Sequence, residues 1–440
     1  MPMIPWRRVS ILGRIALGVL PFSAAPAWAQ HGGHEMPGMR ADSAASTKAH
    51  VMAQAIPLLT RADPGAGGAR SSQLALTQVL LMGRAGLWNG RAELDAALNG
   101  EGLTMPNGEL NTGAYGEGFV DRRHPHTYVH ELMLSGLGRA GPLSYSASAG
   151  RGFAPFGTDD PMMRPIVKFP INHHLSQILE RAALIGAVRV GPALVEGATF
   201  GGDEPSRPSS LPRAARFGDS WSARATILPR AGTEIQASYA RVASPEEESG
   251  AGLDQRKRSV SVRAISADGA RYLMAEWART VERDHTRDQD VFGYESVLVE
   301  GAVREGPFGV ALRLEQTERP EEDRLLEPFR TPRPSVDLSI NGITRWRVAT
   351  LHLAAPAVTR GSLSGFPFVE VARLFAAERD ARSLFTPLHL YGTTRFWMLT
   401  AGLRLRAGSA HARMGRYGVA RPDGPAIGTV SNVVSSAHTH

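Results

Sequence analysis

The chain has 440 residues and a formal net charge of +7, with 47 glycines, 30 prolines and no cysteine. The absence of cysteine excludes disulfides, thiolate metal sites and cysteine nucleophiles. Basic and acidic residues are interspersed, and no compact basic block with interleaved aromatic residues occurs, so nucleic acid is not expected as a partner. Beyond the N-terminal region no apolar run reaches the roughly 20 residues of a membrane-spanning helix, which excludes a helical span of the mature chain.

The N-terminal residues have the order of regions that is typical of a secretory signal peptide. Two arginines precede an apolar stretch over residues 11–22, and Ala27-Trp28-Ala29 forms a small-x-small cleavage site. We therefore assign residues 1–29 to a signal peptide that is cleaved between Ala29 and Gln30. This assignment predicts that the protein is exported.

Residues 30–70 are rich in serine, alanine, proline and glycine, which predicts a flexible periplasmic leader with a short helix over residues 44–60 as an option. Near its start the leader carries a cluster of four metal-ligating side chains, namely His31, His34, Met36 and Met39. Imidazoles suit Cu(II) and thioethers suit Cu(I), so this cluster is a candidate copper site. A short tail without a metal-binding function is the alternative.

From about residue 71 the sequence consists of segments of about ten residues that alternate in polarity, as the strands of a membrane barrel do. Over residues 259–264, for example, Val260 and Val262 alternate with Ser259, Ser261 and Arg263. Short glycine-containing connections separate some segments, and long polar stretches separate others. We predict a transmembrane antiparallel up-and-down β-barrel of 14–16 strands over residues 71–419, with its last strand over residues 409–419 and a C-terminal tail over residues 420–440. A soluble β-sandwich also alternates but rarely runs so many hairpins in one domain.

Four local sequences are unusual for a plain barrel wall. In chain order they are Asp121-Arg122-Arg123-His124-Pro125-His126 with His130 and Glu131, then Arg164-Pro165 with Lys168 and Asn172-His173-His174, then the stretch from Glu196 to Glu204-Pro205, and lastly Asp219-Ser220 with Arg224 and Pro245-Glu246. In combination and order they resemble a family of uncharacterised bacterial outer-membrane β-barrels. The resemblance covers about residues 121–246 and implies a barrel with no assigned reaction, in genomic neighbourhoods that handle copper. The leader is similar to that of copper-resistance outer-membrane proteins.

Two positions depart from that family's pattern. Thr127 stands where the family has an acidic residue, and Gln177-Ile178-Leu179-Glu180 stands where it has an Asp-Ser-Thr-His segment. If those groups help to bind a ligand in the family, this chain binds it differently or not at all.

Histidines and carboxylates in these sequences suit a transition metal such as Cu(II) or Zn(II). His124, His126, His173 and His174 would converge if the loop before Leu175 folded into the mouth of the barrel. The alternative is a structural hydrogen-bond network that fixes a loop inside the barrel, formed by Asp121, Arg122, Glu131, Arg164, Glu196, Glu204, Asp219 and Arg224. Catalytic templates such as His-Glu-x-x-His and Gly-x-Ser-x-Gly are absent, which leaves only Asp219 and Ser220 with a distant histidine as a hydrolase candidate.

The sequence thus predicts a channel or porin-like protein of the bacterial outer membrane that contacts lipid and passes small solutes or ions. The more specific form of this hypothesis links the channel to copper or another transition metal. A copper ion is then the only cofactor that we expect. Two rivals are a barrel enzyme that hydrolyses lipid or peptide, and a structural barrel plugged by residues 153–175. The solute and assembly into homo-oligomers are left open by the sequence.

Overall fold

The computed structural model describes residues 49–64, 71–105, 108–112, 126–158, 160–171, 173, 175–205, 207–247, 249–322, 340–380, 383–384, 386–408 and 413–421. Most of these residues form strands. The strands are β1 (Ala49–Asp63), β2 (Ser71–Leu87), β3 (Ala92–Asn99), β4 (Val129–Ala140), β5 (Leu143–Gly152), β6 (Arg181–Val190), β7 (Ala193–Phe200), β8 (Ser220–Arg230), β9 (Thr233–Val242), β10 (Asp254–Ile265), β11 (Arg271–Asp284), β12 (Gln289–Glu305), β13 (Phe308–Glu322), β14 (Ile340–Ala354), β15 (Val358–Arg360), β16 (Leu363–Glu378) and β17 (Arg395–Gly408). The helices are the single turns α1 (Glu101–Thr104) and α2 (Pro387–Tyr391). Within the described residues no helix is long and apolar enough to cross a membrane.

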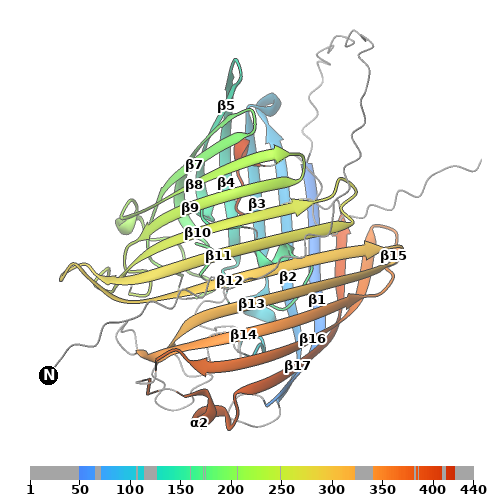
Figure 1. Cartoon of the computed structure of the whole chain (residues 1–440). Helices are drawn as coiled ribbons and strands as arrows, with labels where there is room; N and C mark the ends of the chain where they lie inside the picture. The colour runs from blue at the N-terminus through green and yellow to red at the C-terminus, as the bar shows by residue number, and fades with distance from the viewer. Residues whose placement is uncertain are drawn as a thin grey trace, which may run out of the picture. The chain divides into compact units, whose positions relative to one another are not determined.

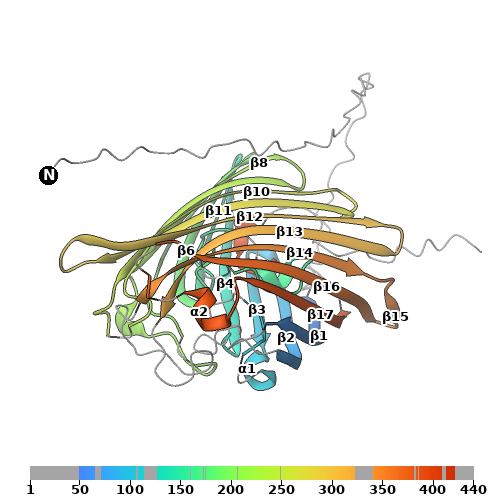
Figure 2. The same cartoon turned by 60° about the horizontal axis from the view of Figure 1, so that its bottom comes forward.

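The strands form one closed antiparallel barrel (Figure 1). Apart from the short β15, each strand pairs with its neighbour in the sequence, and β1 pairs with β17 through ten residue pairs from Met52–Gly408 to Asp63–Trp397. Figure 2 shows these two strands side by side where the ring closes. Of the 17 strands, the three-residue β15 pairs only with β16, while β14 pairs directly with β16, so sixteen strands make the ring. The predicted up-and-down barrel of 14–16 strands is confirmed, and its closure gives each strand of the ring a paired neighbour on both sides.

The two ends of the barrel differ in the length of their connections. At one end, tight turns such as residues 141–142, 191–192, 231–232 and 306–307 join the strands. At the other end the connections are long, as in residues 100–128, 153–180, 201–219, 323–339 and 379–394. Because the number of strands is even, β1 begins and β17 ends at the same, short-turn end.

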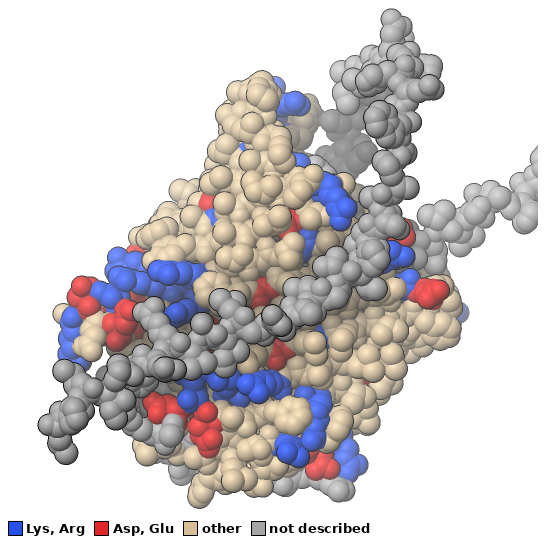
Figure 3. Space-filling view, viewed as in Figure 1, with Lys and Arg blue, Asp and Glu red and all other residues tan. Residues whose placement is uncertain are grey.

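Side chains alternate between the barrel exterior and its interior along each strand. In β8, Ser222, Arg224 and Thr226 are buried inside, whereas Trp221 and Ile227 are exposed outside. The alternation predicted over residues 259–264 is confirmed in β10, where the serines and Arg263 face inward and the valines face outward. The wall seen in Figure 3 is largely uncharged, with charged side chains mainly toward the strand ends. An apolar exterior and a polar interior are what a barrel in lipid requires.

The structure corrects two predicted boundaries. Strand β1 (Ala49–Asp63) lies inside the predicted 30–70 leader, where a helix over residues 44–60 had been an option. Its inward face carries Met52, Ile56 and Leu58, so both faces are partly apolar and the sequence shows no clear alternation in polarity. At the other end β17 closes the ring and ends at Gly408, so residues 409–419 are not the last strand. Residues 413–421 instead lie inside the barrel.

Candidate functional site in the barrel interior

Residues 153–180, which connect β5 and β6, fold into the barrel and cross its interior. Backbone amides of this internal segment donate hydrogen bonds to side chains on distant parts of the wall. Val167 donates to Glu370 of β16 at 2.5 Å, and Ile171 donates to Glu315 of β13 at 2.9 Å. On the opposite side Gly157 donates to Ser238 of β9 at 3.0 Å. The internal segment is therefore anchored across the lumen rather than at one mouth.

A buried ion pair adds to this anchoring. Lys168 of the internal segment forms an ion pair with Glu109 from the connection between β3 and β4, and it also donates to the Leu110 carbonyl at 2.8 Å. Glu109 in turn accepts a hydrogen bond of 2.7 Å from Thr77 of β2. Lys168 and Glu109 are each about 1% exposed, so the charges compensate each other in a site without solvent.

Residues 413–421 form a second segment inside the barrel, here called the C-terminal segment. Tyr417 donates to Glu131 of β4 at 2.6 Å, and the Gly415 amide donates to the same carboxylate oxygen at 2.8 Å. Arg416 lies 3.3 Å from Glu196 of β7, which also receives two hydrogen bonds of 2.7 Å from Arg224 of β8. Wall carboxylates therefore hold this segment in the lumen.

Three buried groups converge beside the internal segment and form what we call the histidine cluster: His126, His130 and Glu180. His130 of β4 shares a hydrogen bond of 2.5 Å between its Nδ1 and Glu180 Oε1. His126 Nδ1 lies 3.6 Å from the same oxygen, and His126 Nε2 lies 3.8 Å from Glu101 Oε2. All candidate ligand atoms of the cluster lie within 4.8 Å of one another. A small cavity between Arg151, Arg181 and Asp203 reaches Glu180.

The charges in the histidine cluster favour an ion pair in the metal-free protein. Burial alone would lower the pKa of His126, but the close approach of the Glu180 carboxylate and the charges of Glu101 and Asp160 outweigh it and raise that pKa to about 9. Burial likewise opposes ionisation of Glu180, yet its contact with His126 and its hydrogen bond to His130 hold its pKa below the ordinary value. For Asp160, burial prevails and raises the pKa. His126 is therefore protonated and Glu180 ionised at neutral pH.

The donor set of the histidine cluster fits a divalent transition metal. Two ligands bound at about 2.0 Å to a tetrahedral ion lie about 3.3 Å apart, close to the 3.6 Å between His126 and Glu180. Within the described residues, His130 Nε2 and Asp160 Oδ2 are buried and have no hydrogen-bond partner. Imidazole and carboxylate ligands suit Zn(II) and Cu(II). A metal ion would have to displace the proton from His126.

Of the histidines singled out in the sequence, the structure brings two together. The rings of His126 and His173 are 5.7 Å apart, and His173 stacks on Phe169 at 4.9 Å. His124 and His174 lie outside the described residues, as do Asp121 and Arg122 and the leader residues His31, His34, Met36 and Met39.

The remaining predicted network residues do not form one group. Glu131 holds the C-terminal segment, while Glu196 pairs with Arg224. Arg164 lies in the internal segment and donates to Thr158 at 3.1 Å. At the long-connection end, Glu204 pairs with Arg181 at 2.9 Å and Asp219 accepts from the Gly202 amide at 2.8 Å.

His130 and Glu180 of the histidine cluster were not predicted as site residues from the sequence. His130 follows His126 by four positions, a spacing that puts both side chains on one side of an extended chain. Glu180 lies in the segment that departs from the family pattern, and only the folding of residues 153–180 into the lumen brings it to the histidines. The hydrolase candidate gains no support from contacts, because Ser220 Oγ donates to Asp219 at 2.7 Å and accepts from the Ala243 amide at 2.9 Å, and neither partner is a histidine.

The barrel resembles solved porin structures. The anion-selective porin from Comamonas acidovorans matches with a TM-score of 0.50 at 9% identity, over 83% of this chain and 100% of that chain. OmpT from Vibrio cholerae, in its trimer form, matches with a TM-score of 0.46 at 8% identity, over 83% of this chain and 100% of that one. Salmonella typhi OmpF in complex with daunomycin matches at 0.44 and 11% identity, over 82% and 98%. No protein-family model and no curated protein matches the sequence. What the chain shares with the first of these structures is the fold.

Proposed function

We propose that this protein is a channel of the bacterial outer membrane for small polar solutes or ions. The observation that carries the proposal is the closed ring of sixteen strands, with apolar side chains outside and polar side chains inside. A sixteen-stranded porin barrel is wide enough to leave an aqueous passage, whereas an eight-stranded one is filled by its own side chains. The predicted export signal and the similarity in fold to the anion-selective porin support the same location and role.

The two segments inside the lumen set the width of the proposed passage. The internal segment is anchored to Glu315 and Glu370 on one part of the wall, and the C-terminal segment is anchored to Glu131 and Glu196 on another. Each carries charged side chains into the interior. A narrowed, charge-lined path would pass small ions and exclude large solutes.

Single-channel conductance in planar bilayers tests the proposal. The refolded mature chain is expected to give stepwise current, and a variant truncated after Gly408, which lacks the C-terminal segment, is expected to give larger steps. Truncation after Arg421 is the matched control, because it keeps residues 413–421 and should leave the step size unchanged. A full-length barrel that refolds but gives no steps would overturn the channel proposal and favour a plugged, structural barrel.

A second candidate role is favoured by a separate observation, the convergence of His126, His130 and Glu180. We propose that these side chains bind one divalent transition-metal ion, Cu(II) or Zn(II), and thereby link the channel to metal handling. The ion would join β4 to the end of the internal segment, because His130 belongs to the wall and Glu180 to that segment. The methionine and histidine leader would be a separate copper-binding element.

Metal content and calorimetric titration of the refolded protein test this role. One ion per chain is expected to bind, and the double variant H126Q/H130Q should lose it. The matched control is H352Q, because His352 is also a buried histidine paired with a glutamate but lies outside the cluster. A variant lacking residues 30–40 separates the leader from the cluster. Metal binding that is lost only with the leader would refute the lumenal site.

A further inference from the structure

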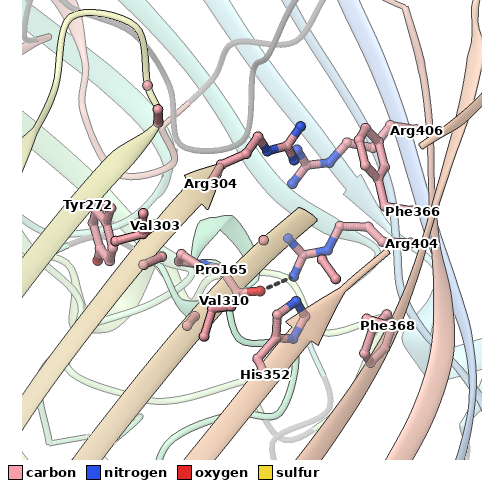
Figure 4. Close-up of a pocket in the computed structure, with 16 residues that line it drawn as sticks. Pro165, Tyr272, Val303, Arg304, Val310, His352, Phe366, Phe368, Arg404 and Arg406 are labelled. Atoms are coloured by element: carbon pink, nitrogen blue, oxygen red, sulfur yellow. Dashed lines mark hydrogen bonds between the residues drawn. The ribbon is translucent and has the colours of Figure 1, made fainter. Parts of the chain in front are cut away.

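A pocket at the short-turn end of the barrel lies outside the histidine cluster. Pro165 of the internal segment lines it, together with residues of β11–β14, β16 and β17 (Figure 4). Gly269 and Ala270, from the short connection between β10 and β11, also line it and place it at this mouth of the barrel. The pocket contains about 90 Å³ of space that the centre of a water molecule can occupy, which is room for several waters or one small ligand.

Three arginines give this pocket its charge. Arg304, Arg404 and Arg406 come from β12 and β17, and Figure 4 shows their guanidinium groups in a column that faces the same space. Among the described residues, no aspartate or glutamate lines the pocket. Within the part of the chain that the structure describes, none of the three arginines forms an ion pair with a carboxylate. Other lumenal arginines, such as Arg224 and Arg313, do form such pairs.

The hydrogen bonds of these arginines go to neutral groups. Arg404 donates to the backbone carbonyls of Arg164 at 3.2 Å and Pro165 at 3.1 Å, while its buried Nε has no acceptor among the described residues. Arg406 donates to the side-chain oxygen of Gln54 at 2.9 Å. Neutral dipoles do not cancel three positive charges held close together, so an anion in this space would be attracted strongly.

The rest of the lining is apolar and aromatic. The ring of Phe366 lies 5.8 Å from the Arg304 guanidinium, and the ring of Phe368 stacks on His352 with centroids 5.4 Å apart. Val310 and several alanines complete the wall. His352 also shares a hydrogen bond of 2.8 Å with Glu370, which accepts from the Val167 amide. Glu370 and Glu300 act electrostatically on Arg404 from outside the pocket lining, whereas the charges acting on Arg406 are those of the other two arginines.

We propose that this pocket binds a small organic carboxylate. The planar guanidinium fork matches the two oxygens of a carboxylate, and Arg404 has an unused buried donor for it. Phe366 and Phe368 would contact the apolar body of the same molecule. This chemistry favours an aromatic or short aliphatic carboxylate over an inorganic anion, which has no apolar part. The inference goes beyond the proposed channel, because the pocket would bind its ligand whether or not the barrel conducts.

Calorimetric titration of the refolded full chain with benzoate tests this inference. Saturable binding is expected, and R404Q should weaken it about tenfold or more, because a charge-assisted hydrogen bond is lost. Benzamide, which has the same shape without the charge, should not bind, and inorganic phosphate should bind more weakly than benzoate. R139Q is the matched control, because Arg139 is an exposed arginine of the short-turn end and bonds only its own turn, at Gly141.

A folding defect in R404Q can be separated from a binding defect. Within the described residues the side chain of Arg304 forms no hydrogen bond, so R304Q should refold normally and still weaken benzoate binding. Absence of saturable benzoate binding would overturn the inference, as would binding that neither R304Q nor R404Q weakens. Phosphate binding as tight as that of benzoate would also refute a carboxylate site with an apolar wall. The conductance of the unliganded barrel is measured separately, so failure of the channel proposal would not be mistaken for failure of this one.

Discussion

The phenol of Tyr417 donates a hydrogen bond of 2.6 Å to Glu131 Oε1, joining two residues that are 286 positions apart. The same phenol oxygen accepts a hydrogen bond of 3.0 Å from the Phe153 amide at the start of the internal segment. One side chain thus connects the wall strand β4, the internal segment and the C-terminal segment. Burial and the negative charge of Glu131 raise the pKa of Tyr417 well above its ordinary value, so the phenol keeps its proton and remains a donor.

Replacement of Tyr417 by phenylalanine should therefore destabilise the barrel. The change leaves the Glu131 carboxylate with one donor fewer and the Phe153 amide without its acceptor, which costs about 1–3 kcal/mol. The free energy of unfolding in urea, measured on the refolded protein, is the readout. Tyr145→Phe is the control, because Tyr145 lies on the exposed face of β5. Equal stability of the two variants would contradict the role assigned to Tyr417.

Breaking the ion pair between Lys168 and Glu109 should be more damaging. Lys168→Met leaves a buried carboxylate without its cation and is expected to cost about 3–5 kcal/mol. The double variant K168M/E109Q removes both charges and should recover part of that loss. The free energies of unfolding of the two variants in urea, each compared with that of the wild type, measure the loss and the recovery. If the double variant is less stable than K168M, the stability lost in K168M does not come from an unpaired Glu109 carboxylate.

The stability of the metal-free protein should depend on the protonation of His126. Its folded pKa, about 9, exceeds the ordinary value of 6.5, so the protonated form is favoured by folding. The stabilisation is complete below pH 6.5 and is lost as the pH rises through about 9. Unfolding followed between pH 6 and pH 10 in the presence of chelator should show this decline. The H126Q variant should show a flatter profile over the same range, and a profile as steep as the wild type would exclude His126 as its cause.

Metal binding to the histidine cluster should stabilise the folded barrel. A metal at a hundred times its dissociation constant adds about 2.7 kcal/mol to the free energy of unfolding, provided that the unfolded chain does not bind it. Thermal unfolding with and without Zn(II) measures the effect, and chelator should reverse it. H126Q/H130Q should show no metal-dependent shift, whereas H352Q should keep it. An equal shift in both variants would place the metal elsewhere in the chain.

The sequence by itself determined the barrel. Polar and apolar residues alternate along strands such as β8 and β10 because one face lies on the outside of the barrel and the other faces the lumen, and that period of two can be read without a structure. The alternation failed for β1, because its inward residues Met52, Ile56 and Leu58 pack in the lumen and are as apolar as the outward ones. The same reading assigned residues 409–419 to the last strand, whereas residues 413–421 lie inside the barrel, where Arg416 and Tyr417 contact carboxylates of the wall.

Only the tertiary structure decided which residues meet in the lumen. His130 and Glu180 are 50 positions apart and share a hydrogen bond because residues 153–180 fold into the barrel. Arg304 and Arg406 face one pocket because β12 and β17 curve around the same mouth of the closed ring. A period of two specifies the face on which a side chain lies, but not its neighbours across the lumen. Those neighbours follow from the closure of the ring and from the paths of the two internal segments, which depend on contacts between residues far apart in the chain.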